Sequence, residues 1–228
     1  MYIVKKLEDY LGFSFDKKLE SYLDEAQANK LEVNFADDPI VDIRTLENAD
    51  LLHFDKTIPN FWVRKELGKK IIEVAMILKS MGLGLKLYEL YRSLKKQTFE
   101  FNQISKEMKE KFPNLKPQEL WEKTTEFIAD PALRPPHVTG GAVDLVLVDK
   151  DGNELDMGTE INSIDQKSYL TCKDISLNAL TNRALLLKLM LSVKLAPLPS
   201  EWWHFSYGEN YWAAFYNKKV MYDVVEIS

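Results

Sequence analysis

The sequence predicts an α+β fold in which helices pack on a central, mainly antiparallel sheet. Apolar residues recur at helical spacing in residues 60–81 and 177–195, so we expect each segment to form a helix with a buried face. Residues 83–91 alternate in part between apolar and polar, and residues 142–148 are apolar and β-branched, so both are expected to be strands. The turn residues 149–153 then predict a hairpin, which makes neighbouring strands antiparallel.

The chain has 228 residues, a length that suits one domain with a small appendage. We expect residues 1–36 to form a helical N-terminal extension and residues 37–228 to form the main domain. Residues 1–34 are polar with a partial apolar stripe, which is typical of an amphipathic packing element. A cap over a site and a helical hairpin used for association are the alternatives. Residues 41–46 alternate and indicate a short strand.

Helix boundaries in the middle of the chain carry ordinary capping signals. Asn60 can cap the first long helix, and Gly82 can end it because glycine tolerates left-handed backbone. Residues 97–129 are expected to form two helices, separated near Pro113. The second of these begins near Pro117, a favourable residue for a first helical turn.

The C-terminal third is predicted to combine a loop, a core helix and further strands. Residues 158–171 have mixed polarity and are expected to form one wall of a site. The helix at 177–195 is apolar nearly all round, as a central core helix is. Residues 211–227 are aromatic and rich in strand-forming types, so we expect one or two strands there.

Composition narrows the classes of function. The chain is 46% hydrophobic, enough for a full core, and its net charge of −5 argues against general binding to nucleic acid or anionic membranes. Cys172 is the sole cysteine, so no intrachain disulfide is possible, and a structural role is more probable a priori than a nucleophilic one. The oligomeric state is left open.

The sequence also gives an expectation for the cellular compartment. No apolar run reaches transmembrane length, so no membrane span is expected. The first residues lack the apolar core of a signal peptide. The simplest placement is therefore cytoplasmic, or periplasmic if the start is processed.

Two of the three histidines lie in short motifs with a carboxylate nearby. His137 follows two prolines, so it belongs to an extended or turning segment. Asp144 interrupts the apolar strand that follows, where an ionised carboxylate is costly unless it is paired or bound to a metal. His204 lies in a second motif. Two imidazoles and one carboxylate with an open fourth position are typical of catalytic zinc sites, so we expect one Zn²⁺ per chain.

The second motif is Glu201-Trp202-Trp203-His204. A regular strand would place Glu201 and His204 on opposite faces, so a bend or the strand entrance must bring both to one site. The tryptophans between them predict a poorly hydrated environment. The third histidine, His53, is more simply a packed or surface residue than a group that supports the site.

Together these motifs resemble the D-alanyl-D-alanine dipeptidases, zinc peptidases related to the D,D-carboxypeptidases and the hedgehog signalling domain. The resemblance rests on His137-x2-Gly140-x-Ala142-x-Asp144 followed by the second motif. It extends to residues 82–92, which end in Tyr-Arg, to the Met157-Gly158 pair and to Asn182-Arg183, and so covers roughly residues 60–210. It implies that residues 37–228 form a catalytic domain of this kind.

The resemblance also implies roles for five residues. His137, Asp144 and His204 would hold the zinc ion and leave one position for water. Glu201 would take the proton of that water and pass it to the leaving amine. By position alone, Arg92 is most simply a surface ion-pair residue, but the matching arginine of the family stabilises the tetrahedral oxyanion.

Substrate-binding residues are expected at Asn162 and Trp203, and here the chain departs from the family pattern. The family carries an acidic residue at the position of Asn162, where it contacts the free ammonium of the dipeptide; Glu160 or Asp165 could take its place. The family also carries a serine where this chain has Pro135, and often a proline where it has Ser93.

Three functions remain open at this stage. The first is hydrolysis of a D-alanyl-D-alanine-type dipeptide. The second is a D,D- or L,D-carboxypeptidase activity on muropeptides, because loss of the acidic contact would permit a blocked N-terminus. The third is a metal-binding interaction domain without turnover.

Overall fold

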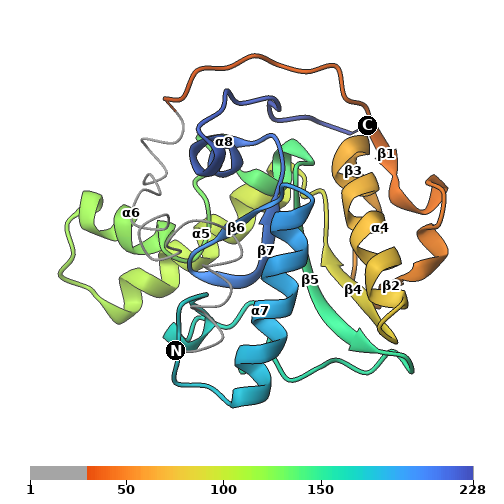
Figure 1. Cartoon of the computed structure of the whole chain (residues 1–228). Helices are drawn as coiled ribbons and strands as arrows, with labels where there is room; N and C mark the ends of the chain where they lie inside the picture. The colour runs from red at the N-terminus through yellow and green to blue at the C-terminus, as the bar shows by residue number, and fades with distance from the viewer. Residues whose placement is uncertain (1–29, 228) are drawn as a thin grey trace.

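The computed structural model describes residues 30–227 (Figure 1). Its main sheet has five strands in the order β2-β4-β5-β7-β6, and β1 and β3 form a separate antiparallel pair. Neighbours in the main sheet are antiparallel except β2 and β4, which run parallel. The strands are β1 (Ile40–Asp42), β2 (Leu52–Phe54), β3 (Trp62–Arg64), β4 (Leu83–Glu89), β5 (Ala142–Asp149), β6 (Ala196–Leu198) and β7 (Glu201–Ser206). The predicted α+β class with a mainly antiparallel sheet is confirmed.

Helix α4 contacts strand β4, helix α7 contacts strand β5, and the two helices contact each other (Figure 1). Helices α5 and α6 pair with one another beside the sheet. The α-helices are α4 (Lys65–Lys79), α5 (Leu94–Lys111), α6 (Pro117–Thr125), α7 (Leu177–Ser192) and α8 (Asn210–Tyr216). Short 3₁₀ turns cover η1 (Ile43–Thr45), η2 (Ala49–Leu51), η3 (Pro136–Thr139) and η4 (Gln166–Ser168).

The core lies between this helical layer and the sheet. The buried stripe of α4 includes Leu67, Ile71 and Leu78, as its helical spacing predicts. Strand β5 is buried from Ala142 to Val148, which explains why its sequence is apolar almost without alternation. The strand that carries Asp144 is therefore packed on both faces.

Several boundaries differ from the sequence-based expectation. The helix expected from residue 60 begins at Lys65, because Trp62–Arg64 pair with β1 instead. Asn60 accepts a hydrogen bond from the backbone N–H of Trp62 and donates one to the carbonyl of Tyr91. The strand expected at 41–46 ends at Asp42, whose carboxylate caps the 3₁₀ turn that follows.

The predicted hairpin after β5 is reduced to one antiparallel bridge, between Val148 and Glu154. The two helices expected within residues 97–129 are confirmed as α5 and α6. The loop expected at 158–171 is confirmed, apart from the short turn η4.

The prediction of strands in residues 211–227 is wrong for their first part, which belongs to α8. Glu209 caps this helix by accepting hydrogen bonds from the backbone N–H groups of Tyr211 and Trp212. Its Trp212 and Phe215 are three residues apart and both buried, so one helical face packs inward. Only Val220 retains strand-like pairing, with Val33.

Residues 1–29, and with them most of the predicted helical extension, lie outside the described residues. Residues 30–36 are not helical, and Val33 forms a parallel bridge with Val220. Asn34 and Ala36 donate backbone hydrogen bonds to the carbonyls of Val220 and Met221, so this segment lies beside the C-terminal tail. The division at residue 36 stays a prediction.

Two glycines with the same left-handed backbone allow a matched stability test. Gly208 has φ +76°, and a Cβ there would lie 2.4 Å from the ring of the buried Tyr222; Gly82 has φ +72° with no atom within 4 Å of that point. Gly82→Ala should destabilise by about 1–2 kcal/mol through backbone strain alone. Gly208→Ala should lower the free energy of unfolding by about 3–5 kcal/mol, because the clash with the Tyr222 ring adds to the backbone strain. Urea unfolding of both variants measures the difference. Equal losses of stability in the two variants would show that the Tyr222 ring moves aside at no cost in free energy.

Candidate metal centre

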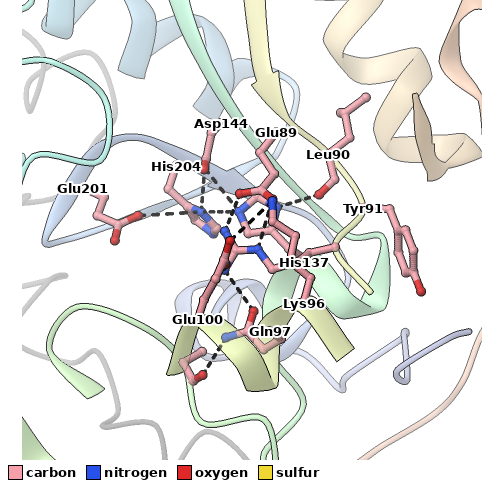
Figure 2. Close-up of polar contacts among 12 residues, drawn as sticks. Glu89, Leu90, Tyr91, Lys96, Gln97, Glu100, His137, Asp144, Glu201 and His204 are labelled. Carbon is pink, nitrogen blue, oxygen red and sulfur yellow. Dashed lines mark hydrogen bonds and ion pairs between the residues drawn. The ribbon is translucent and has the colours of Figure 1, made fainter. Parts of the chain in front are cut away.

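Three buried side chains converge at one end of the central strands (Figure 2). His137 comes from η3, Asp144 from β5 and His204 from β7. The antiparallel register of β5 and β7 pairs Asp144 directly with His204. His204 Nδ1 lies 2.9 Å from Asp144 Oδ1 and 3.2 Å from His137 Nε2, and His137 Nε2 lies 3.3 Å from the same carboxylate oxygen.

This triangle of donor atoms fits a divalent metal ion. His137 Nδ1 lies 2.7 Å from the carbonyl oxygen of Leu90, so it carries the ring proton, and the lone pair of Nε2 faces the carboxylate. This contact is favourable when a cation lies between Nε2 and the carboxylate, which is a proton in the metal-free protein and a metal ion in the loaded one. Metal–ligand bonds of about 2.0–2.2 Å in a tetrahedral site separate ligand atoms by about 3.3 Å, close to the separations seen here. The Leu90 carbonyl is a typical outer partner of a ligating histidine.

Electrostatics favour a cation at the same place. Burial alone would raise the pKa of Asp144, but His137 and His204 hold the pKa of this carboxyl well below its usual range. Burial would lower the pKa of His137, yet Asp144 raises it above the usual value. The carboxylate is thus ionised inside the protein, where a negative charge needs a positive partner.

Glu201 reaches the same centre through an irregularity in β7. Pairing with β6 jumps from Pro197 opposite Phe205 to Leu198 opposite Glu201, so β7 bends between its first residue and His204. This is the bend that the sequence requires. Glu201 Oε2 lies 3.9 Å from His204 Nδ1. Desolvation raises the pKa of Glu201 to about 7; the charge of Asp144 adds to the rise, while His204 and Arg92 oppose it.

Arg92 follows β4 and is fixed by neighbours that sequence reasoning missed. Its guanidinium contacts both carboxylate oxygens of Glu89, and Nη1 donates to Gln97 Oε1 at 3.0 Å and lies 3.2 Å from Glu100 Oε2. Burial would raise the pKa of Glu89, but the neighbouring charges, chiefly that of Arg92, lower this pKa to about 2. Lys96 Nζ also contacts Glu89 Oε1, at 2.8 Å. Glu89 could have been suspected as a carboxylate at the end of an apolar strand, three residues before Arg92.

A cavity of about 590 Å³ opens onto the metal-ligand group. Asn162 and Trp203, the predicted substrate-binding residues, both line it together with Arg92 and Glu201. Asn162 lies in the loop expected to form a wall, with left-handed backbone at φ 62°. The structure therefore gathers every predicted site residue around one cavity, although their roles stay predictions.

The remaining candidates lie elsewhere. His53 is exposed on β2 and does not line this cavity, in agreement with the surface interpretation. Cys172 is a free, half-buried thiol. Among the helices within residues 30–227, none combines the length and apolarity needed to cross a bilayer.

Comparison with known proteins gives a consistent result. A family model described as D-ala-D-ala dipeptidase matches residues 58–224. The chain is similar to D-alanyl-D-alanine dipeptidases of Synechocystis (37% identity over 101 residues, 40% of this chain and 41% of the relative) and Escherichia coli (28% over 138 residues, 60% of each). A third, from Enterococcus faecalis, is 28% identical over 163 residues, 66% of this chain and 77% of that protein.

The matches thus span about two fifths of the length of the first relative and three fifths of the length of the second.

Among solved structures, the chain is similar to one described as "Structure of the LdcB LD-carboxypeptidase reveals the molecular basis of peptidoglycan recognition". The TM-score is 0.48 and the identity 17%, over 82% of this chain and 77% of that one.

The convergent donor atoms predict binding of one divalent metal ion per chain. Asp144→Asn and His204→Ala should each lower metal affinity by at least ~100-fold, because each removes a ligand from a buried site. His53→Ala is the matched control and should bind metal normally. Isothermal titration of the metal-free protein, checked by elemental analysis, gives the stoichiometry and affinity. Unchanged binding in Asp144→Asn would rule out this centre.

Proposed function

We propose, since the chain belongs to the D-ala-D-ala dipeptidase family, that it is a zinc-dependent peptidase that hydrolyses D-alanyl-D-alanine-type dipeptides. Membership rests on the family match over residues 58–224. The observation that carries the activity is the convergence of a buried His-Asp-His group, a carboxylate with a raised pKa and a fixed guanidinium on one cavity. Such a set supplies the groups that metal-assisted peptide hydrolysis requires.

His137, Asp144 and His204 would hold the zinc ion, a borderline-soft metal that suits two imidazoles and a carboxylate. When bound, zinc lowers the pKa of a water molecule and polarises a carbonyl group. Asp144 offsets part of the metal's charge within a buried site. The proton of His137 Nδ1 on the Leu90 carbonyl fixes the tautomer in which Nε2 faces the ion.

Glu201 is the proposed general base and acid. It lies close to His204 but is not part of the three-atom donor group, so its carboxylate is free to accept the proton of the attacking water. A carboxylate whose pKa is raised towards 7 can both accept this proton and pass it to the leaving amine. Trp203, which is buried beside it, helps to keep the site dry.

Arg92 is the proposed oxyanion stabiliser. Glu89 and Gln97 hold the guanidinium in one orientation, so little reorganisation is needed when negative charge develops on the carbonyl oxygen. Its backbone N–H donates to the carbonyl of His137 at 3.2 Å, which ties its position to a metal ligand.

One observation favours a second candidate, a D,D- or L,D-carboxypeptidase acting on peptidoglycan peptides. The ammonium of a free dipeptide is best bound by a carboxylate, but the loop wall has the neutral amide of Asn162 at the matching position, and Asp165 of the same wall already accepts a hydrogen bond from the backbone N–H of Lys167. An N-acylated peptide has no such ammonium and forms ordinary hydrogen bonds with an amide.

The catalytic role is tested with Glu201→Gln. Zinc-loaded wild-type protein should release D-alanine from D-alanyl-D-alanine, and the variant should lose about 10²–10⁴ in kcat while retaining one zinc, because it cannot move the proton. Ninhydrin detection of D-alanine measures turnover, and Glu73→Gln, an exposed glutamate of α4 outside this cavity, is the control. A wild-type protein that binds zinc but releases no D-alanine from free or N-acylated peptides would favour a non-catalytic metal-binding domain.

The choice between the two substrates is tested with Asn162→Asp. A carboxylate there should raise kcat/KM for free D-alanyl-D-alanine relative to its N-acetyl form by about 10-fold, because a charge-assisted hydrogen bond replaces a neutral one. Asn102→Asp, on the exposed face of α5, controls for added charge. An unchanged ratio would show that Asn162 does not contact the amine.

A further inference from the structure

A substrate that ends in a free carboxylate brings a negative charge into the cavity. That charge is stable there only beside a cationic or N–H donor. Of the described residues that line the cavity, Arg92 and Lys96 are the ones with lysine or arginine side chains. The proposed metal ion serves the water and the scissile carbonyl, so the partners that remain for a terminal carboxylate are these two side chains and uncharged donors.

Arg92 is poorly placed for this task. Its side chain is 14% exposed and already contacts Glu89, Gln97 and Glu100. The hydrogen-bonding capacity that remains to the guanidinium is needed, in the proposed function, at the scissile carbonyl. Lys96 differs because its side chain is 40% exposed. An ammonium has three N–H donors; Lys96 Nζ donates one to Glu89 Oε1 at 2.8 Å and lies 3.5 Å from Glu100 Oε1.

Lys96 also lies at a suitable distance from Arg92, the proposed oxyanion donor. Lys96 Nζ and Arg92 Nε contact the same oxygen of Glu89, at 2.8 and 3.1 Å. The two nitrogens are therefore at most about 6 Å apart, the length of one to two peptide residues. In a substrate cleaved before its last residue, the terminal carboxylate follows the scissile carbonyl by one residue.

A purely structural role accounts less well for this lysine. Lys96 lies in the first turn of α5, where the helix dipole disfavours a cation. Arg92 already neutralises the buried Glu89, and the Lys96 side chain is 40% exposed, so water screens its contribution to stability.

We infer that Lys96 binds the C-terminal carboxylate of the substrate and so determines specificity for peptides with a free C-terminus. The inference rests on the proposed function and adds a residue to it. Arg92 and Lys96 share Glu89 as a common anchor, one serving the reacting carbonyl and the other the chain terminus.

The test compares D-alanyl-D-alanine with its C-terminal amide in Lys96→Met and Lys96→Arg. Lys96→Met should raise KM for the free acid by about 10- to 100-fold and change kcat and the amide reaction little, because one charge-assisted hydrogen bond is lost. Lys96→Arg should retain most of the preference for the acid. Lys95→Met, an exposed neighbour that does not line the cavity, should behave as wild type.

A binding measurement makes the result independent of turnover. Calorimetry on zinc-loaded Glu201→Gln protein, with and without Lys96→Met, should show the same loss of affinity for the acid and none for the amide. Equal losses for acid and amide, or a fall in kcat for both, would overturn the inference and assign Lys96 to the support of Glu89 and Arg92. Turnover that does not depend on Lys96 refutes this inference alone. If wild-type protein neither binds nor cleaves either ligand, the proposed function fails as well.

Discussion

The site depends on the register of three neighbouring strands. Glu89 of β4 pairs with Asp144 of β5, and Asp144 pairs with His204 of β7, so two carboxylates and an imidazole form a row across the sheet. A shift of one residue in either pairing would turn one of these side chains to the opposite face. The apolar packing of β5 on both faces fixes that register, so the hydrophobic core determines which polar groups meet.

The same register creates an electrostatic problem that the rest of the site resolves. Two buried carboxylates on adjacent strands repel, and the charge of Asp144 opposes ionisation of Glu89. Arg92 compensates the charge of Glu89 from one side, and the two histidines compensate Asp144 from the other, where the proposed metal ion would add to them. The proposed oxyanion donor and the proposed metal site therefore both follow from one arrangement of charge, which explains why the two lie next to each other.

Local patterns predicted those parts of the molecule that local interactions decide. The apolar runs of β5 and α7, the helix end near Gly82 and the two histidine motifs are visible in the sequence because burial and capping leave clear signatures. Other parts depend on distant partners. Trp62–Arg64 leave the predicted helix to pair with β1, and Lys96 resembles an ordinary solvated helix residue until the sheet delivers Glu89 beside it. The error at α8 has a local cause, because Glu209 caps this helix although glutamate is not among the residue types that favour the capping position.

The placement of these groups separates chemistry from recognition. The proposed general base and two of the three proposed metal ligands lie on strands of the main sheet, where a displacement would disturb the core. The proposed recognition groups stand on a loop, at Asn162, and in the exposed first turn of a helix, at Lys96. Substitution there leaves the core intact, so it costs the fold little. A chain built in this way can retain the reaction while its preference for groups at either end of the peptide substrate changes. That is the pattern expected here, where both histidine motifs are kept but Asn162 stands at the position at which the resemblance implies an acidic residue.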